Sequence, residues 1–156
     1  MAASMKTSGT DELISMLSTL GDKAPDIAAQ ALYDGAGVVA DAYSQAVDQI
    51  MTAKRRHKEP GGRLPTPEEK EALKATGIAR FNKDYDGVDT MVGVAEGYAN
   101  LRGRKKAIKL LANSINHGTN FMKKQAVFRR AQRTSGNAAQ NAMVAKADEL
   151  INQIVK

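Results

Sequence analysis

The chain has 156 residues, a net charge of +6 at pH 7 and no cysteine. This length predicts one compact domain spanning residues 1–156, and the lack of cysteine excludes disulfides, cysteine-ligated metal sites and thiol catalysis. Only 4% of the residues are aromatic and none is tryptophan, so the core must be built mainly from aliphatic side chains, and no apolar run approaches the ~20 residues of a membrane-spanning helix.

The first predicted element is a short amphipathic helix over residues 11–20. Residues 1–10 before it are polar, and we expect them to be flexible and to lack a signal peptide. Leu13, Leu17 and Leu20 recur at helical spacing, which places them on one face. Gly21 is expected to end this helix, because glycine commonly follows the last helical turn.

A much longer helix is predicted from Pro25 to about Lys58. Proline is tolerated in a first helical turn, and apolar residues then recur with helical periodicity. The segment Gly35-Ala36-Gly37 has almost no side chain, so it permits close approach of another helix. Because glycine inside a helix costs ~1 kcal/mol relative to alanine, we expect tight packing or a kink there to compensate.

Residues 59–66 predict a loop, since Pro60, Gly61, Gly62 and Pro65 disfavour regular structure. This loop fits either a plain connector or an arm that becomes ordered on a partner. Thr66-Pro67-Glu68-Glu69 then predicts a helix start with a capping box, and this short helix should end near Thr76-Gly77.

A β-hairpin is predicted from residues 78–81 and 88–94, which are rich in strand formers and are joined by a turn-rich segment ending in Asp86-Gly87. The spacing Asn82-x-Asp84-x-Asp86 resembles the start of a calcium loop. Its twelfth position is Gly93 rather than a bidentate glutamate, so we expect no calcium site. The fold class expected overall is helix-dominated α+β, with long N-terminal and C-terminal helices packed with a small antiparallel hairpin sheet.

Two further helices are predicted in the last third. Residues 104–116 carry Ile108, Leu111 and Ile115 on one face behind a basic side, and Gly118 should stop this helix. The final helix is expected from about Lys124 to the C-terminus, with Ser135-Gly136-Asn137 as a point where it could weaken or bend.

Positive charge concentrates in three clusters. Residues 54–58 fit a solvated helix end, whereas residues 102–109 and 123–133 bracket a turn that contains Phe121 and Met122. An apolar side chain beside fixed positive charge is typical of a docking surface. The candidate interaction residues are therefore Phe121, Met122, Lys123, Lys124, Gln125, Phe128, Arg129, Arg130, Arg104, Lys105 and Lys106. For Phe128, helical spacing also allows an inward position in the core.

The same turn carries a family resemblance. The motif Gly118-Thr119-x-Phe121-Met122-x-x-Gln125-x-x-x-Arg129-x-Ala131 resembles that of the neck proteins, or tail-completion proteins, of long-tailed siphophages. The opening Glu12-Leu13-x-x-x-Leu17-x-x-Leu20-Gly21-Asp22-Lys23-Ala24-Pro25, its continuation Ala31-Leu32-Tyr33-x-Gly35-Ala36, and Gly87-Val88-Asp89-Thr90-x-Val92-Gly93 are similar to the same family. The chain departs from it at Ala126, where relatives tend to carry proline, so Gln125 is expected to be more helical here.

The resemblance implies a structural virion protein of the head–tail neck, which completes the tail or joins it to the filled head as part of a hexameric ring. The partners would be other head–tail connector and tail proteins. The subunit could be monomeric in solution and would pass through the host cytoplasm during assembly. Its basic clusters would face acidic neighbours or the DNA in the channel, and the sequence leaves both open.

The sequence predicts no catalytic residue, metal ligand or cofactor. His57 and His117 lack a second histidine, a cysteine or a carboxylate pair at metal-binding spacing. Gly35-x-Gly37 lies in a predicted helix rather than after a strand, so it is not a dinucleotide motif. The alternative function is a small basic helical nucleic-acid-binding protein, which would explain the charge, although no known reader motif is present.

Overall fold

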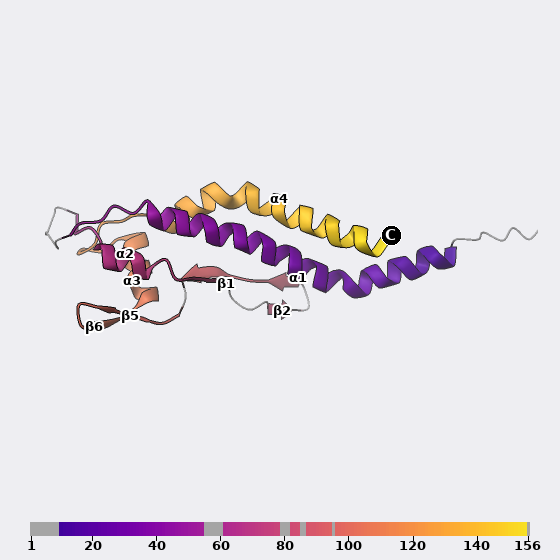
Figure 1. The fold of residues 1–156 in the computed structure, drawn as a ribbon, viewed down its shortest axis with the longest axis horizontal. Helices are drawn as coiled ribbons and strands as arrows, with labels where there is room; N and C mark the ends of the chain where they lie inside the picture. Colours follow the sequence, from indigo (N-terminus) through magenta and orange to yellow (C-terminus); the bar gives the residue numbers. More distant parts are fainter. Residues whose placement is uncertain (1–9, 55–60, 79–81, 85–86, 95, 156) are drawn as a thin grey trace, which may run out of the picture.

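The computed structural model describes residues 10–54, 61–78, 82–84, 87–94 and 96–155. Two long antiparallel helices, α1 (Thr10–Asp48) and α4 (Val127–Val155), lie side by side along the molecule (Figure 1). Most shorter elements gather where α1 ends and α4 begins. This head comprises α2 (Pro67–Ala72), β5 (Tyr98–Leu101), β6 (Arg104–Ala107) and α3 (Ile108–His117). The predicted helix-dominated α+β class is confirmed.

The N-terminal part of the chain forms one helix rather than the two that were predicted. Gly21 does not end the first helix, and Pro25 lies inside α1. Proline at position 25 cannot donate to the carbonyl of Gly21, and its ring crowds that carbonyl. α1 changes direction in its N-terminal part, which fits a bend at this pair (Figure 1). The first turns of α1 extend past the C-terminal end of α4 (Figure 1).

α1 ends at Asp48, ten residues before the predicted end. The Lys70 ammonium donates to the carbonyl oxygen of Asp48 at 2.6 Å, which satisfies one of the carbonyls left free at the helix end. The chain then turns so that Ile50 is buried and the Ala53 amide donates to the carbonyl of Pro65. The cluster at 55–58 and loop residues 59–60 lie outside the described residues, as do residues 1–9.

The predicted close approach at Gly35 is confirmed. A Cβ atom built on Gly35 would lie 2.5 Å from Cγ and Cε of Met143 on α4, so a side chain there would displace the methionine. α4 itself runs without interruption through Ser135-Gly136-Asn137, where a weak point was predicted. The buried Ser135 hydroxyl donates to the carbonyl of Ala131 at 2.9 Å, so this polar side chain is satisfied inside the helix.

The capping box predicted at Thr66 is confirmed. The Thr66 hydroxyl accepts from the Glu69 amide, and the Glu69 carboxylate accepts from the Thr66 amide. α2 ends at Ala72 rather than near Gly77, because residues 76–78 already belong to a strand.

The described residues form three two-stranded antiparallel sheets. β1 (Thr76–Ile78) pairs with β4 (Val92–Val94), and β2 (Asn82–Asp84) pairs with β3 (Gly87–Asp89). This confirms the predicted hairpin, although its strands are shorter than expected and residues 79–81 and 85–86 lie outside the described residues.

The third pair, β5 with β6, was not predicted. Residues 104–107 form a strand, and the helix that was expected from residue 104 begins at Ile108. The two strands are joined by Arg102 and Gly103, whose φ angles are 55° and 76°. Positive φ at both central residues is the geometry of a type I′ turn, whose twist matches that of the paired strands. Lysine and arginine are good helix formers, so nothing in residues 104–107 opposed an early start of the helix that Ile108, Leu111 and Ile115 predicted.

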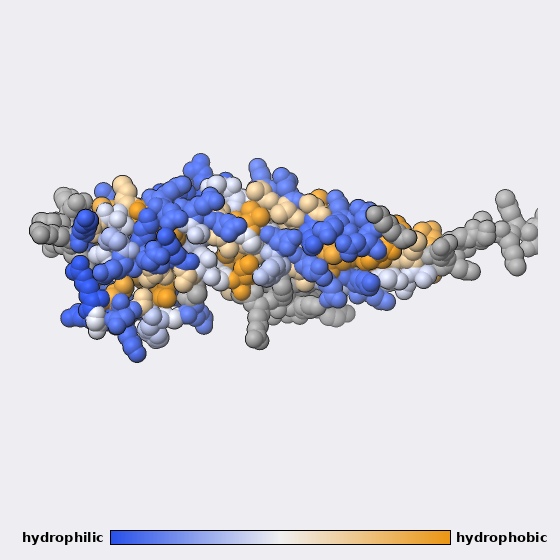
Figure 2. Space-filling view, in the orientation of Figure 1, coloured by the Kyte–Doolittle hydropathy of each residue, from blue (hydrophilic) through white to orange (hydrophobic). Residues whose placement is uncertain are grey.

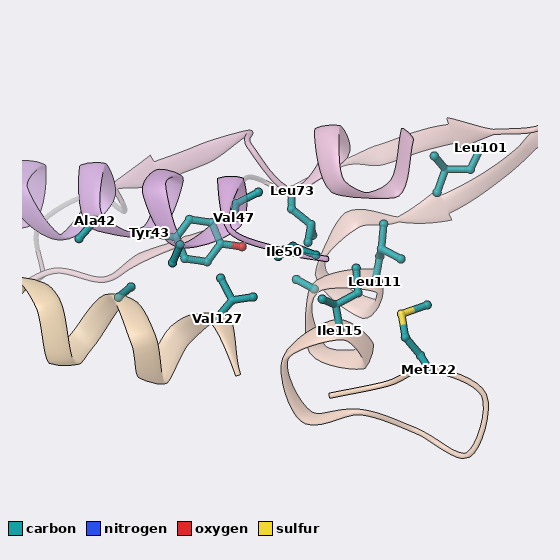
Figure 3. Packing of buried hydrophobic residues seen from close by; sticks show 13 residues of the cluster. Ala42, Tyr43, Val47, Ile50, Leu73, Leu101, Leu111, Ile115, Met122 and Val127 are labelled. Atoms are coloured by element: carbon teal, nitrogen blue, oxygen red, sulfur yellow. The ribbon is translucent and has the colours of Figure 1, made fainter. Parts of the chain in front are cut away.

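The main hydrophobic cluster joins the end of α1 to the head (Figure 3). Its buried members are Ala42, Tyr43, Ala46, Val47, Ile50, Leu73, Leu101, Leu111, Ala112, Ile115, Met122, Val127 and Ala131. As the composition predicted, nearly all of these side chains are aliphatic, and Tyr43 is the one ring among them. The cluster holds α3 and the turn after it against both long helices.

Tyr43 makes stability depend on pH. Burial raises the pKa of its hydroxyl from 10.0 to about 12. Below pH 10 the hydroxyl is neutral in both states; between the two values the unfolded chain ionises first, so stability is lost as pH rises from 10 to 12. A two-unit shift corresponds to roughly 2–3 kcal/mol. Urea unfolding on both sides of this window should show that loss, and Tyr43→Phe should reduce it. Equal losses in both proteins would contradict the assignment.

Candidate docking surface

The turn after α3 is built by local hydrogen bonds. Gly118, at φ 78°, ends α3 as predicted, and its amide donates to the carbonyl of Ser114 at 3.0 Å. The Thr119 hydroxyl accepts from the amides of Phe121 and Met122 at 3.2 and 3.0 Å. Backbone hydrogen bonds also join Thr119 and Met122 in both directions. The tip is therefore a closed four-residue turn with Asn120 and Phe121 at its centre.

Residues 62–63, which we call the clamp, lie against this turn. The Arg63 amide donates to the carbonyl of Phe121, and the Lys123 amide donates to the carbonyl of Arg63, both at 2.9 Å. A Cβ atom on Gly62 would lie 2.7 Å from the backbone nitrogen of Met122, and Gly62 has a φ of +100°, so only glycine fits there. The structure thus gives residues 62–63 of the predicted loop a defined place against the turn.

The side chains of Phe121 and Met122 lie on opposite sides of this turn, an outer and an inner side. Met122 is buried in the main cluster, whereas the ring of Phe121 is 77% exposed. Lys123 and Lys124 are also exposed. An aromatic ring thus projects from a fixed backbone beside two cations, which is the arrangement that an intermolecular contact needs.

An open hollow of about 620 Å³ lies beside the ring of Phe121. Its lining consists of Arg63, Lys106, Ser114, Thr119, Asn120, Phe121 and Met122. The hollow brings together two predicted clusters, because Lys106 comes from β6 and Phe121 from the turn. Arg104 and Lys105 lie next to Lys106 on the same strand and are exposed. We call this hollow, together with Phe121, Lys123 and Lys124, the docking surface.

The buried carboxylate of Glu69 pairs with two cations of the docking surface, Arg63 and Lys106. Glu69 has 0% exposure, and its two oxygens accept from the Arg63 guanidinium at 2.6 and 2.7 Å. The Lys106 ammonium lies 3.8 Å from the same carboxylate. This pairing fixes the side chain of Arg63, whose backbone amide and carbonyl bind the turn. The sequence identified Glu69 as a capping residue, but nothing in its spacing indicated burial or the partner Arg63.

Gln125 and Phe128, which were also candidates, face inward. Gln125 is 5% exposed, and it is not helical, although a more helical Gln125 was expected. Its backbone amide donates to the carbonyl of Ile115. No described residue accepts from its side-chain nitrogen. The ring of Phe128 is half-buried and stacks on that of Tyr43, with centroids 5.3 Å apart and planes at 24°. Of the two alternatives for Phe128, the structure shows the inward one.

The remaining candidates form a separate arginine face at the start of α4. Arg129 and Arg133 are exposed, and Arg130 is half-buried with a weak bond of 3.4 Å to the carbonyl of Gln125. Together with Ala126 and Thr134 they line a hollow of about 510 Å³. Like charges four residues apart destabilise a helix slightly, and so do cations in its first turns. An anionic partner would relieve both effects.

The two phenylalanines should therefore respond differently to truncation. Phe121→Ala removes an exposed ring, so the free energy of unfolding should change by less than about 0.5 kcal/mol. Phe128→Ala removes a ring packed on Tyr43 and should cost roughly 2–4 kcal/mol. Urea unfolding of both variants measures the difference. Equal losses would contradict the outward position of Phe121 and the inward position of Phe128.

Among the described residues, no group of three or more histidine or carboxylate side chains is placed to hold a metal ion. His117 ends α3, is exposed, and lies next to Asn116, whose side-chain nitrogen is 3.1 Å from the imidazole Nε2. None of the helices in the described ranges combines the length and hydrophobicity needed to cross a bilayer.

Comparison of the chain with protein-family models, with curated proteins and with solved structures found no match. The assignment of function therefore depends on the site and on the motif resemblance.

Proposed function

We propose that this chain is a structural virion protein of the phage head–tail neck, which completes the tail or joins it to the filled head as part of a hexameric ring. The observation that carries this proposal is the ring of Phe121, 77% exposed on a turn that backbone hydrogen bonds hold in place. A pre-ordered turn loses little entropy on binding, and an exposed aromatic ring is a frequent hot spot.

The chemistry of the docking surface supports a protein partner with acidic and apolar groups. Lys106, Lys123 and Lys124 place positive charge near one aromatic ring, and no acidic side chain lines the hollow. The guanidinium of Arg63 is already paired with the buried Glu69. Partners of this kind would be neighbouring connector and tail proteins or further copies of the chain. The protein would act in the virion after assembly in the host cytoplasm, and no catalytic step is part of this role.

The test is complementation of phage that lack the protein. Phe121→Ala should give filled heads and separate tails that fail to join, and the infectious titre should fall by about tenfold or more, since a hot-spot truncation costs 1–2 kcal/mol or more at each contact. The matched control is Tyr98→Ala, which removes a side chain 73% exposed on the outer face of β5. Normal titres with the Phe121 variant would contradict the proposal.

A second candidate, nonspecific binding to nucleic acid, is favoured by the arginine face of α4. Arg129, Arg130 and Arg133 meet at one hollow, and removal of each arginine that pairs with a phosphate should reduce the salt slope of DNA binding by about 0.9. Binding of the purified protein to duplex DNA that weakens steeply with salt, and that Arg129→Ala with Arg133→Ala removes, would support this function. It would place DNA rather than acidic protein at the arginine face.

A further inference from the structure

Charge is divided unequally along the molecule. α1 contains seven acidic residues and one lysine: Asp11, Glu12, Asp22, Asp26, Asp34, Asp41, Asp48 and Lys23. The chain as a whole carries +6, so its positive excess lies entirely outside α1. The head contains the docking surface and the basic strand β6, and the free end of α1 lies at the opposite end of the molecule (Figure 1). The acids are spread along α1, from Asp11, Glu12 and Asp22 near its free end to Asp41 and Asp48 near the head, while the basic strand β6 lies in the head.

The free end of α1 also exposes an apolar face. Leu13, Ile14 and Leu17 are 57%, 63% and 59% exposed and lie close together on α1. This part of α1 extends beyond the C-terminal end of α4, and hydrophobic residues show at that end of the surface (Figures 1 and 2). α4 ends at Val155, short of these turns, so it leaves this face uncovered (Figure 1).

The two ends are complementary in chemistry. The α1 end offers three large aliphatic side chains, with Asp22 exposed one turn further on and Asp11 and Glu12 before them in the sequence. The docking surface offers the exposed ring of Phe121 and the cations Lys123 and Lys124 beside an open hollow. Opposite charge around a shared apolar contact favours this pairing and disfavours pairing of two α1 ends, where acids would face acids.

We infer that the occupant of the docking surface is the N-terminal end of α1, Leu13 to Asp22, from a second copy of this chain. The inference deepens the proposed ring, since it rests on the same docking surface and names its partner. The contact is heterologous, because different patches of the two copies meet and each copy keeps one free end of each kind. Repetition of such a contact closes into a ring or continues as a filament.

Disulfide trapping tests this contact directly, because the chain has no cysteine and an engineered thiol is therefore unique. Ser18→Cys and Asn120→Cys change exposed residues beside the proposed contact and leave Leu13, Ile14, Leu17 and Phe121 in place. Mixed under mild oxidation, the two variants should form a mixed dimer about tenfold faster than a control pair of Asn120→Cys with Gln140→Cys, whose cysteine is exposed on α4. Rates equal to those of the control pair would overturn the inference.

Charge variants add a second readout. Lys123→Glu with Lys124→Glu in the Asn120→Cys protein should slow trapping, and Asp22→Lys in the Ser18→Cys protein should restore it. Faster trapping of Ser18→Cys with itself than with Asn120→Cys would also overturn the inference, because it would show two α1 ends in contact. If trapping fails while Phe121→Ala still blocks head–tail joining, the neck function stands and its partner is another protein. If trapping succeeds and joining is normal, the self-contact stands and the neck function falls.

Discussion

Replacement of Glu69 by alanine should destabilise the protein by about 3–5 kcal/mol, one of the two largest effects expected of a single substitution. The carboxylate is fully buried and accepts two hydrogen bonds from Arg63 and one from the amide of Thr66. Its removal leaves a half-buried guanidinium without its counter-charge and a buried amide without an acceptor. The clamp that holds Phe121 outward should loosen at the same time.

Two variants separate the contributions. Glu69→Gln can still accept from the Thr66 amide, because glutamine also closes a capping box, but it removes the charge that pairs with Arg63. Its loss should lie between that of Glu69→Ala and that of Glu68→Ala. Glu68 is exposed in the same helical turn and should contribute only about 0.3–1 kcal/mol through the helix dipole. Urea unfolding measures all three, and similar losses for both alanine variants would contradict the role of the buried pair.

Local sequence rules were sufficient where short-range chemistry decides the structure. The capping box at Thr66 and the helix stop at Gly118 depend on side-chain or backbone bonds within four residues, and both were predicted correctly. The close approach at Gly35 followed from its missing side chain. The same kind of rule was wrong at Gly21, where α1 continues across a glycine and a proline although their local preferences oppose a helix.

The sequence located the segment that forms the candidate site, but not which of its side chains are exposed. The motif located Phe121 and the charge clusters located its neighbouring lysines, whereas the inward or outward position of each side chain depended on contacts from distant residues. Arg63 lies 58 positions before Phe121 in the sequence, and its backbone holds the turn on which the ring of Phe121 is exposed. Tyr43 decides that Phe128 faces in. Neither contact has a periodic signal, so spacing alone could not reveal it.

Ala126 explains why the final helix begins at Val127 rather than near Lys124. Its φ is +49°, a left-handed conformation that turns the chain between Gln125 and α4. Its amide donates to the carbonyl of Asn116 at 3.1 Å, and its own carbonyl accepts the first helical bond from Arg130. Alanine has no side chain to cap the helix, so the Asn116 side chain takes that role and accepts from the Phe128 amide at 2.9 Å.

Substitution of Ala126 by proline should therefore cost about 3 kcal/mol or more, although the neck-protein motif tends to carry proline there. The proline ring fixes φ near −65°, which is incompatible with +49°, and it removes the bond to Asn116. Ala126→Gly should instead leave stability unchanged or raise it by up to about 1 kcal/mol, since glycine adopts positive φ without strain. Urea unfolding of the pair separates backbone strain from loss of the methyl group. If the proline variant is as stable as the parent, α4 can begin after a residue with φ near −65°. The positive φ at Ala126 is then not required.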